Sequence, residues 1–202
     1  MQSQLTPDAD LVAPVYGFAI RRFTISEYHR LADSGVLTDD DRVELLEGFI
    51  SPKMVHSPIH DATVCATEYL IRPMLSQAWI LRIQSAISLA TSEPEPDVVI
   101  ALGPPARYAE RHPNGKDIAL VIEIAETSLL RDRRKAIIYA SGGVPVYWIV
   151  NLSERTLEYF DMPNQGSYER CRVFTSTDKV EFGLDCMSCD SICVSDLFVA
   201  LK

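Results

Sequence analysis

A nearly continuous apolar segment, DIALVIEIA at residues 117–125, most restricts how this chain can fold. Side chains alternate between the two faces of a strand, so one face of this segment is wholly aliphatic. That face comprises Ile118, Leu120, Ile122 and Ile124. An apolar run of this kind is typical of a central strand that is covered on both faces. The segment therefore predicts an α/β domain with a buried sheet.

Glu123 lies on the other face of this strand, among Ala119, Val121 and Ala125. An ionised carboxylate on a covered face costs several kcal/mol unless a cation or hydrogen-bond donors accompany it. A bound metal ion would meet that need, and so would a salt bridge to an arginine. The pattern alone leaves both interpretations open.

Asp97 opens a second apolar strand, which we predict over residues 97–102. It follows Pro96, and proline is tolerated at the start of a strand because its missing N–H lies outside the hydrogen-bonded ladder. Asp97 is therefore either a functional acid at the start of a core strand or an ordinary turn or strand-edge residue.

A helix is predicted after the central strand, with Thr127 or Ser128 as its N-cap and Gly142-Gly143 at its end. At roughly 100° per residue, Lys135 falls on the flank of the apolar arc, together with Ser128, Asp132 and Tyr139. The connection is short enough for Lys135 to reach the C-terminal end of the Glu123 strand. The alternative is a solvated lysine beside Arg131 or Asp132.

Three sequence stretches here resemble a known family. They are EPEPDVVIA, VIEIAETS and the pattern D-x-x-K-x-x-x-Y-A-x-x-G-V-P-x-Y-W-I-V that begins at Asp132. Together they resemble the Uma-type family of restriction-endonuclease-like proteins, which belongs to the PD-(D/E)XK nuclease superfamily. The resemblance covers roughly residues 20–160 and includes VELLEGFI and His60.

This resemblance implies a restriction-endonuclease-like core, with a mixed central sheet flanked by helices. It also implies hydrolysis of DNA phosphodiester bonds with Mg²⁺ or Mn²⁺ as cofactor. Asp97, Glu123 and Lys135 would be catalytic, and Glu44, Asp97 and Glu123 would bind the metal. The usual lysine of the superfamily lies two residues after the second acid, where this chain has Ala125. The resemblance therefore points to Lys135 on the following helix instead.

Two other classes of function stay open. The chain could be a non-catalytic nucleic-acid-binding or transposon-associated module, or an interaction protein that retains the nuclease fold. Its net charge of −9 argues against a large non-specific DNA surface, because basic contacts to phosphate dominate affinity for nucleic acid. A local basic patch is still predicted, at Arg131, Arg133, Arg134 and Lys135, with Arg107 and Arg111 on a nearby loop.

At 202 residues the chain is predicted to form a single domain, 1–202, with residues 1–19 as an N-terminal arm. No stretch is long and apolar enough to span a membrane, and the N-terminus lacks a secretory pattern, which favours the cytoplasm. By analogy with nucleases that address two strands, we expect a homodimer.

The other predicted elements are local. Thr24 and Glu27 form a capping box for a helix that ends at Gly35, and residues 43–54 form a hairpin. A further helix is expected at 62–75, a turn at 162–167 and a final helix at 194–201. Strands are expected at 79–86, 146–150, 156–160 and 168–174.

Three further sets of side chains are ambiguous. His56 and His60 are four residues apart and could bind metal, but Ser57-Pro58 argues against one helix through both, so we interpret His56 as loop. Gln84 could hydrogen-bond in the site or be a satisfied interior amide. The cluster Cys186, Cys189 and Cys193 could bind zinc with Cys171 as a fourth ligand, but we favour the interpretation that these are buried free thiols.

Overall fold

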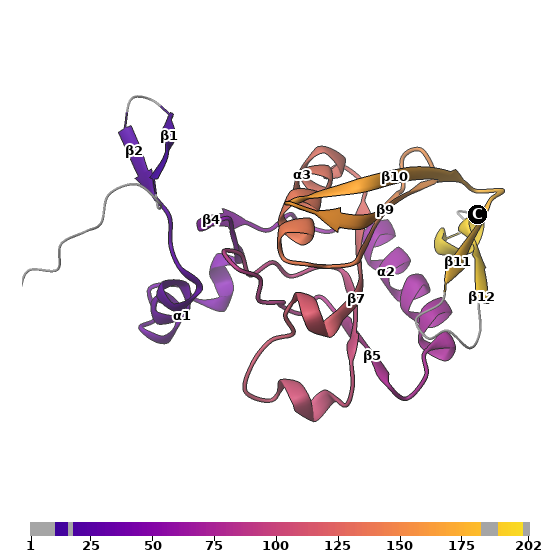
Figure 1. The fold of residues 1–202 in the computed structure, drawn as a ribbon, viewed down its shortest axis with the longest axis horizontal. Coiled ribbons are helices and arrows are strands. Elements are labelled where there is room, and N and C mark those ends of the chain that lie inside the picture. Colours follow the sequence, from indigo (N-terminus) through magenta and orange to yellow (C-terminus); the bar gives the residue numbers. More distant parts are fainter. Residues whose placement is uncertain (1–10, 16–17, 183–189, 200–202) are drawn as a thin grey trace, which may run out of the picture. The chain divides into compact units, whose positions relative to one another are not determined.

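The computed structural model describes residues 11–15, 18–182 and 190–199 of the chain (Figure 1). These residues belong to two compact units, which are described separately. The smaller unit comprises Met1–Lys53 and Thr91–Glu93, and the larger comprises Met54–Ala90 and Pro94–Lys202. The single-domain organisation and the arm at residues 1–19 stay predictions.

The smaller unit contains two hairpins and one helix. Its elements are β1 (Leu11–Val15), β2 (Phe18–Arg21), α1 (Ile25–Asp33), β3 (Val43–Leu46) and β4 (Phe49–Pro52). The capping box is confirmed, since the Thr24 hydroxyl accepts a hydrogen bond from the Glu27 N–H and the Glu27 carboxylate accepts one from the Thr24 N–H. The hairpin at residues 43–54 is also confirmed, with Glu47-Gly48 at its turn.

The larger unit is built on a six-stranded mixed sheet in the order β10-β9-β8-β7-β6-β5. Its strands are β5 (Trp79–Ile83), β6 (Val98–Leu102), β7 (Ile118–Ala125), β8 (Val146–Asn151), β9 (Thr156–Asn164) and β10 (Ser167–Thr175). Only β7 and β8 pair in parallel, and α3 (Leu129–Ser141) makes the crossover between them. The predicted α/β fold with a mixed central sheet flanked by helices is confirmed.

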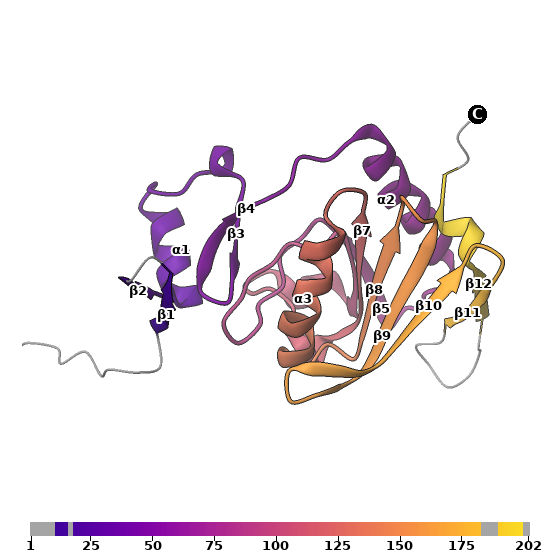
Figure 2. The ribbon, with the colours of Figure 1, turned by 90° about the horizontal axis from the view of Figure 1, so that it is seen from above.

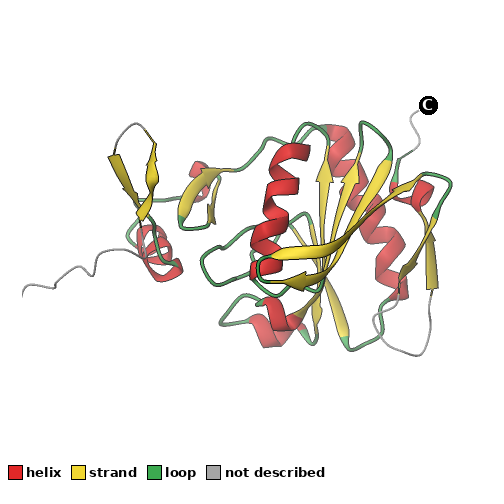
Figure 3. Ribbon diagram, turned by 45° about the horizontal axis from the view of Figure 1, so that its top comes forward, coloured by secondary structure: helices red, strands yellow, loops and turns green. Residues whose placement is uncertain are grey.

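Helices cover the two faces of this sheet (Figures 2 and 3). The aliphatic face of β7 packs into a core with Val64 and Ile71 of α2 (Pro58–Ile71) and with residues of the C-terminal hairpin. That hairpin consists of β11 (Lys179–Phe182) and β12 (Asp190–Cys193). The other face lies against α3, where the Tyr139 and Tyr147 rings meet with centroids 4.7 Å apart. Glu123 lies on this second face and is buried.

The start of α2 differs from the sequence prediction. The helix begins at Pro58 rather than residue 62, and Ser57 caps it by accepting a hydrogen bond from the His60 N–H. Proline suits this first position because its φ is already helical and its missing N–H would have no partner there. At the other end, Pro73 limits the helix as expected, leaving a short 3-10 turn at Arg72–Met74. His60 consequently lies in the first turn of α2.

Other differences are smaller. The turn expected at residues 162–167 is confined to Gln165 and Gly166, both with positive φ, so β9 continues to Asn164. The final helix is a short 3-10 segment, Val194–Leu197. Cys186 and Cys189 fall outside the described residues. No helix in the described part of the chain is long and apolar enough to cross a membrane.

Candidate metal centre

Polar side chains meet at the C-terminal end of β7, beside the starts of β6, α2 and α3. Asp97 connects three of these elements. Its Oδ2 accepts a hydrogen bond from the Ile124 backbone N–H at 2.8 Å and lies 3.1 Å from His60 Nε2. Asp97 is buried, and its pKa is lowered because the contacts with His60 and Ile124 outweigh the effect of burial. It is therefore more than a turn residue.

Asp97 and Glu123 lie opposite each other on neighbouring strands. The antiparallel register pairs Val98 with Ile122, and extending it by one residue places Asp97 across from Glu123. Directly opposed residues in such a pair have Cβ atoms about 4.5–5.5 Å apart. Asp97 is also close enough to raise the pKa of Glu123 by charge repulsion. The two acids thus lie on the same side of the sheet.

Lys135 points towards Glu123, as the helical arc predicted. Its Nζ donates a hydrogen bond to Glu123 Oε1 at 3.0 Å, and the Tyr139 hydroxyl donates to the same oxygen at 2.6 Å. Lys135 retains only 6% of its exposed area, so the solvated alternative is wrong. A lysine, not an arginine, provides the cation for this buried carboxylate.

Burial dominates the protonation of this site. It raises the pKa of Glu123 to about 8, against the opposing effect of Lys135. Burial likewise raises the pKa of Asp132 to about 6, although the Ser128 hydroxyl donates to Asp132 Oδ2 at 2.5 Å. Asp132 is the acid that sequence reasoning did not assign. Its spacing of three residues from Lys135 was the available signal.

His56 also belongs to this neighbourhood. It lies in the loop before α2, as interpreted, but its ring stacks on His60 with centroids 4.1 Å apart. Gln84 Nε2 is 3.0 Å from His56 Nδ1, so this exposed amide lies beside the site rather than in the interior. For His60, burial lowers the pKa, but the contact with Asp97 outweighs it and the net pKa is raised. Sequence spacing indicated the histidine pair, but the intervening Ser57-Pro58 concealed their contact.

The donor set fits a divalent cation. Carboxylate oxygens suit Mg²⁺ and Mn²⁺, and imidazole nitrogens suit transition metals. Three acids, Asp97, Glu123 and Asp132, are buried here, and Lys135 is the one buried lysine among the described residues. Asp97 and Asp132 both raise the pKa of Glu123, and Asp97 also raises that of Asp132. A dication would relieve this repulsion. Glu44 is buried on β3 in the smaller unit, and its role as a ligand stays a prediction.

The basic patch is smaller than predicted. Arg107 and Arg111 both pair with the buried Asp117, at 3.0 and 2.7 Å. Arg133 binds Glu158 through both carboxylate oxygens. Lys135 is engaged with Glu123. The arginines therefore have structural partners that the linear sequence did not reveal.

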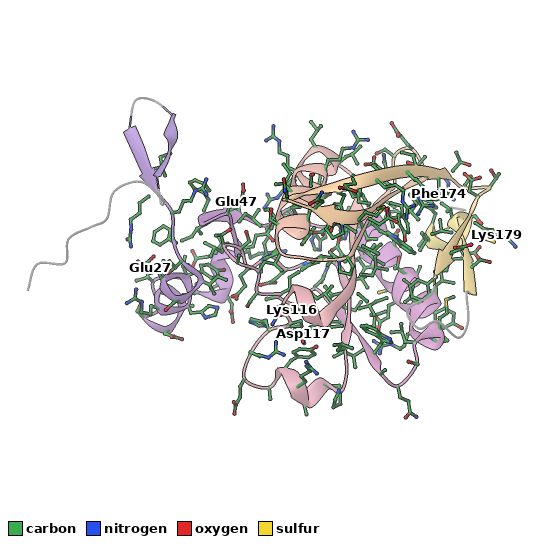
Figure 4. All side chains as sticks on the ribbon, in the orientation of Figure 1. Glu27, Glu47, Lys116, Asp117, Phe174 and Lys179 are labelled. Carbon is green, nitrogen blue, oxygen red and sulfur yellow. The ribbon has the colours of Figure 1, made fainter. Side chains whose placement is uncertain are left out.

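A hollow of about 410 Å³ lies elsewhere, on β9, β10 and β11. Phe174 and Lys179, two of its lining residues, are labelled in Figure 4. Arg172 lies over the rings of Tyr159 and Phe174 in this hollow, at 4.6 and 5.4 Å from their centroids. Asp161 pairs with Arg170 at 2.5 Å and with Arg172 at 3.5 Å. Because its arginines are paired internally, we do not assign the hollow to phosphate binding.

Two comparisons with known proteins found a match. The model of the Uma2 family, described as "Putative restriction endonuclease", matches residues 25–185. The fold is similar to a crystal structure from Anabaena variabilis described as "a putative nuclease belonging to DUF820". The two chains are 17% identical with a TM-score of 0.62, and the match covers 87% of this chain and 97% of the other. No curated protein matches the chain.

Proposed function

The chain belongs to the Uma2 family of restriction-endonuclease-like proteins, and from this premise we propose that it hydrolyses DNA phosphodiester bonds with Mg²⁺ or Mn²⁺ as cofactor. The observation that supports this most directly is the buried Glu123–Lys135 contact beside Asp97. A carboxylate pair with an adjacent lysine provides both metal ligands and a positive group for a phosphate. These side chains come from two strands and a helix of the sheet core, which hold them rigidly.

In this proposal, Asp97 and Glu123 hold the cation on one side of the sheet. The cation would polarise the phosphate and make water more acidic. Lys135 would orient the attacking water or stabilise the negative charge that develops on the phosphate. Tyr139 would hold Glu123 in place through its hydrogen bond. The reaction requires no covalent intermediate with the protein.

The central test is cleavage of plasmid and single-stranded DNA with Mg²⁺ or Mn²⁺. Lys135→Met keeps the apolar stem of the side chain but removes its charge, so we expect cleavage to fall by about 10²- to 10³-fold. Metal affinity should not weaken in this variant. The matched control is Lys116→Met, an exposed lysine in the segment before β7, which should cleave normally.

Asp97→Asn should abolish cleavage and also weaken metal binding, because it removes a ligand charge. Asp40→Asn, in the exposed turn of the smaller unit, is its control. Wild-type protein that cuts neither substrate with either metal, or Lys135→Met protein that cuts normally, would contradict the proposal. The non-catalytic binding module would then be the better reading.

The proposal includes a homodimer, so that two sites can address two strands. Two large apolar side chains on the exposed side of α3 are compatible with self-association: Leu130 is 74% and Ile137 54% exposed, seven residues apart. Light scattering at micromolar concentration tests this, and a monomer would contradict it.

A further inference from the structure

Two histidines approach the acidic site from the segment that enters α2. One ligating atom from each of His56, His60 and Asp97 lies within 4.8 Å of the other two. The group combines two imidazoles with one carboxylate. Asp61, an exposed acid in the first turn of α2, also places its Oδ1 3.4 Å from Nδ1 of both rings.

We propose that His56, His60 and Asp97 bind one transition-metal dication, and that the two imidazoles give this site a higher affinity for such metals than for Mg²⁺. Imidazole nitrogen suits transition metals, whereas Mg²⁺ prefers oxygen ligands and retains several waters. The inference rests on the proposed function, because Asp97 belongs to both ligand sets. It extends that function from a requirement for metal to the identity of the metal.

The local backbone sets the distance between the two histidines. Ser57 caps α2 and Pro58 occupies its first position, so the chain between His56 and His60 is held in one conformation. The rings are stacked, with 27° between their planes. Little rearrangement is then needed to direct both towards one ion.

The surroundings support binding rather than mere packing. The His60 and Asp97 side chains are 9% and 7% exposed, whereas His56 is 28% exposed and leaves a path from solvent. Gln84 Nε2 lies 3.0 Å from His56 Nδ1 and limits rotation of the ring. In the metal-bound state the amide would turn over, so that its oxygen accepts the Nδ1 proton and leaves Nε2 of His56 free to bind the ion. The ion would replace the proton between His60 Nε2 and Asp97 Oδ2, so binding should release protons.

The first test is calorimetric titration of the full chain with Ni²⁺ and with Mg²⁺, in the absence of DNA. His56→Ala should weaken Ni²⁺ binding by at least about tenfold, since loss of even an outer partner costs about 10- to 100-fold. Mg²⁺ binding should stay within about twofold. His112→Ala, in the loop before β7, is the matched control and should change neither. Ni²⁺ binding to cysteine thiols is the same in all variants, so it does not affect the comparison between them.

A second test needs no substitution. Ni²⁺ is paramagnetic and should broaden the ring resonances of His56 and His60 well before those of His112. Equal broadening, loss of Ni²⁺ and Mg²⁺ affinity by the same factor in His56→Ala, or wild-type protein without preference for Ni²⁺, would overturn the inference.

The two proposals can fail separately. Protein that cleaves DNA with Mg²⁺, while His56→Ala binds Ni²⁺ normally, supports the nuclease and refutes the histidine site. Protein that binds Ni²⁺ through both histidines but cuts no DNA with any of these metals supports the histidine site and refutes the nuclease.

Discussion

Burying the Glu123 carboxylate costs folding free energy, and a role in metal binding would explain why the chain keeps it. Its pKa rises from 4.5 to about 8 through burial, so the folded state holds this proton more tightly than the unfolded chain does. The sign follows from linkage: its contribution to stability is complete below about pH 4.5 and is lost as the pH rises towards 8. Above that pH the metal-free fold contains an ionised carboxylate that is poorly compensated.

Replacing this acid should therefore stabilise the metal-free protein at alkaline pH. We expect Glu123→Gln to gain on wild type by up to about 1.4 kcal/mol per pH unit between roughly pH 5 and 8. Thermal unfolding in EDTA across this range measures the difference, with exposed Glu110→Gln as control. Parallel curves for wild type and Glu123→Gln would contradict the expectation. Added Mg²⁺ should raise the melting temperature of wild type only.

At the scale of elements, the start of α2 is held by a side chain that serves two partners. The Ser57 hydroxyl caps the helix and also donates to Glu126 Oε2 at 2.5 Å, just beyond β7. Ser57→Ala should destabilise the protein by about 1 kcal/mol, as lost N-caps do. For a chain of this size, that lowers the melting temperature by about 2–4 °C. Ser34→Ala, at the C-cap of α1, is the comparison and should have a smaller effect.

The end of α3 packs against the segment before β7 with no room for a side chain. A Cβ on Gly115 would lie 1.8 Å from the Gly142 carbonyl oxygen, which is a backbone atom and cannot simply rotate away. Gly115→Ala should therefore cost several kcal/mol, beyond the usual effect of a point substitution. Gly143→Ala meets open space but has positive φ, so it should cost only about 1–2 kcal/mol. Chemical denaturation of both variants tests the contrast; equal effects would contradict it.

For the whole molecule, charge limits how DNA can be held. The chain has a net charge of −9, and Arg107, Arg111, Arg133 and Arg170 are paired with its own carboxylates. We therefore expect few direct phosphate contacts. A protein with six to ten such contacts loses about 10³–10⁵ in affinity between 50 and 200 mM salt. We expect the DNA affinity of this protein to fall less steeply with salt concentration. Fluorescence anisotropy of labelled DNA with the Lys135→Met variant and Ca²⁺ measures this, and DNA binding should be weaker when EDTA replaces Ca²⁺.

Much of the fold could be predicted from sequence because its signals are local. Alternation identified β7, and capping residues located α1 and α3. The orientation of Lys135 followed from helical spacing. The contacts that stayed hidden join distant segments: Asp117 with its two arginines, Glu158 with Arg133, and His56 with Gln84. No pattern within one element indicates which distant charge will neutralise another.

The strand order also bears on how the sheet is made. Each strand of the six-stranded sheet pairs with the next one along the chain, and four of the five pairs are antiparallel. The parallel β7–β8 pair is the exception, because α3 must dock before the two strands can meet. The same docking step brings Lys135 to Glu123. We therefore expect the β7–β8 pair and the Glu123–Lys135 contact to form in one step, so that the carboxylate is buried together with its cation.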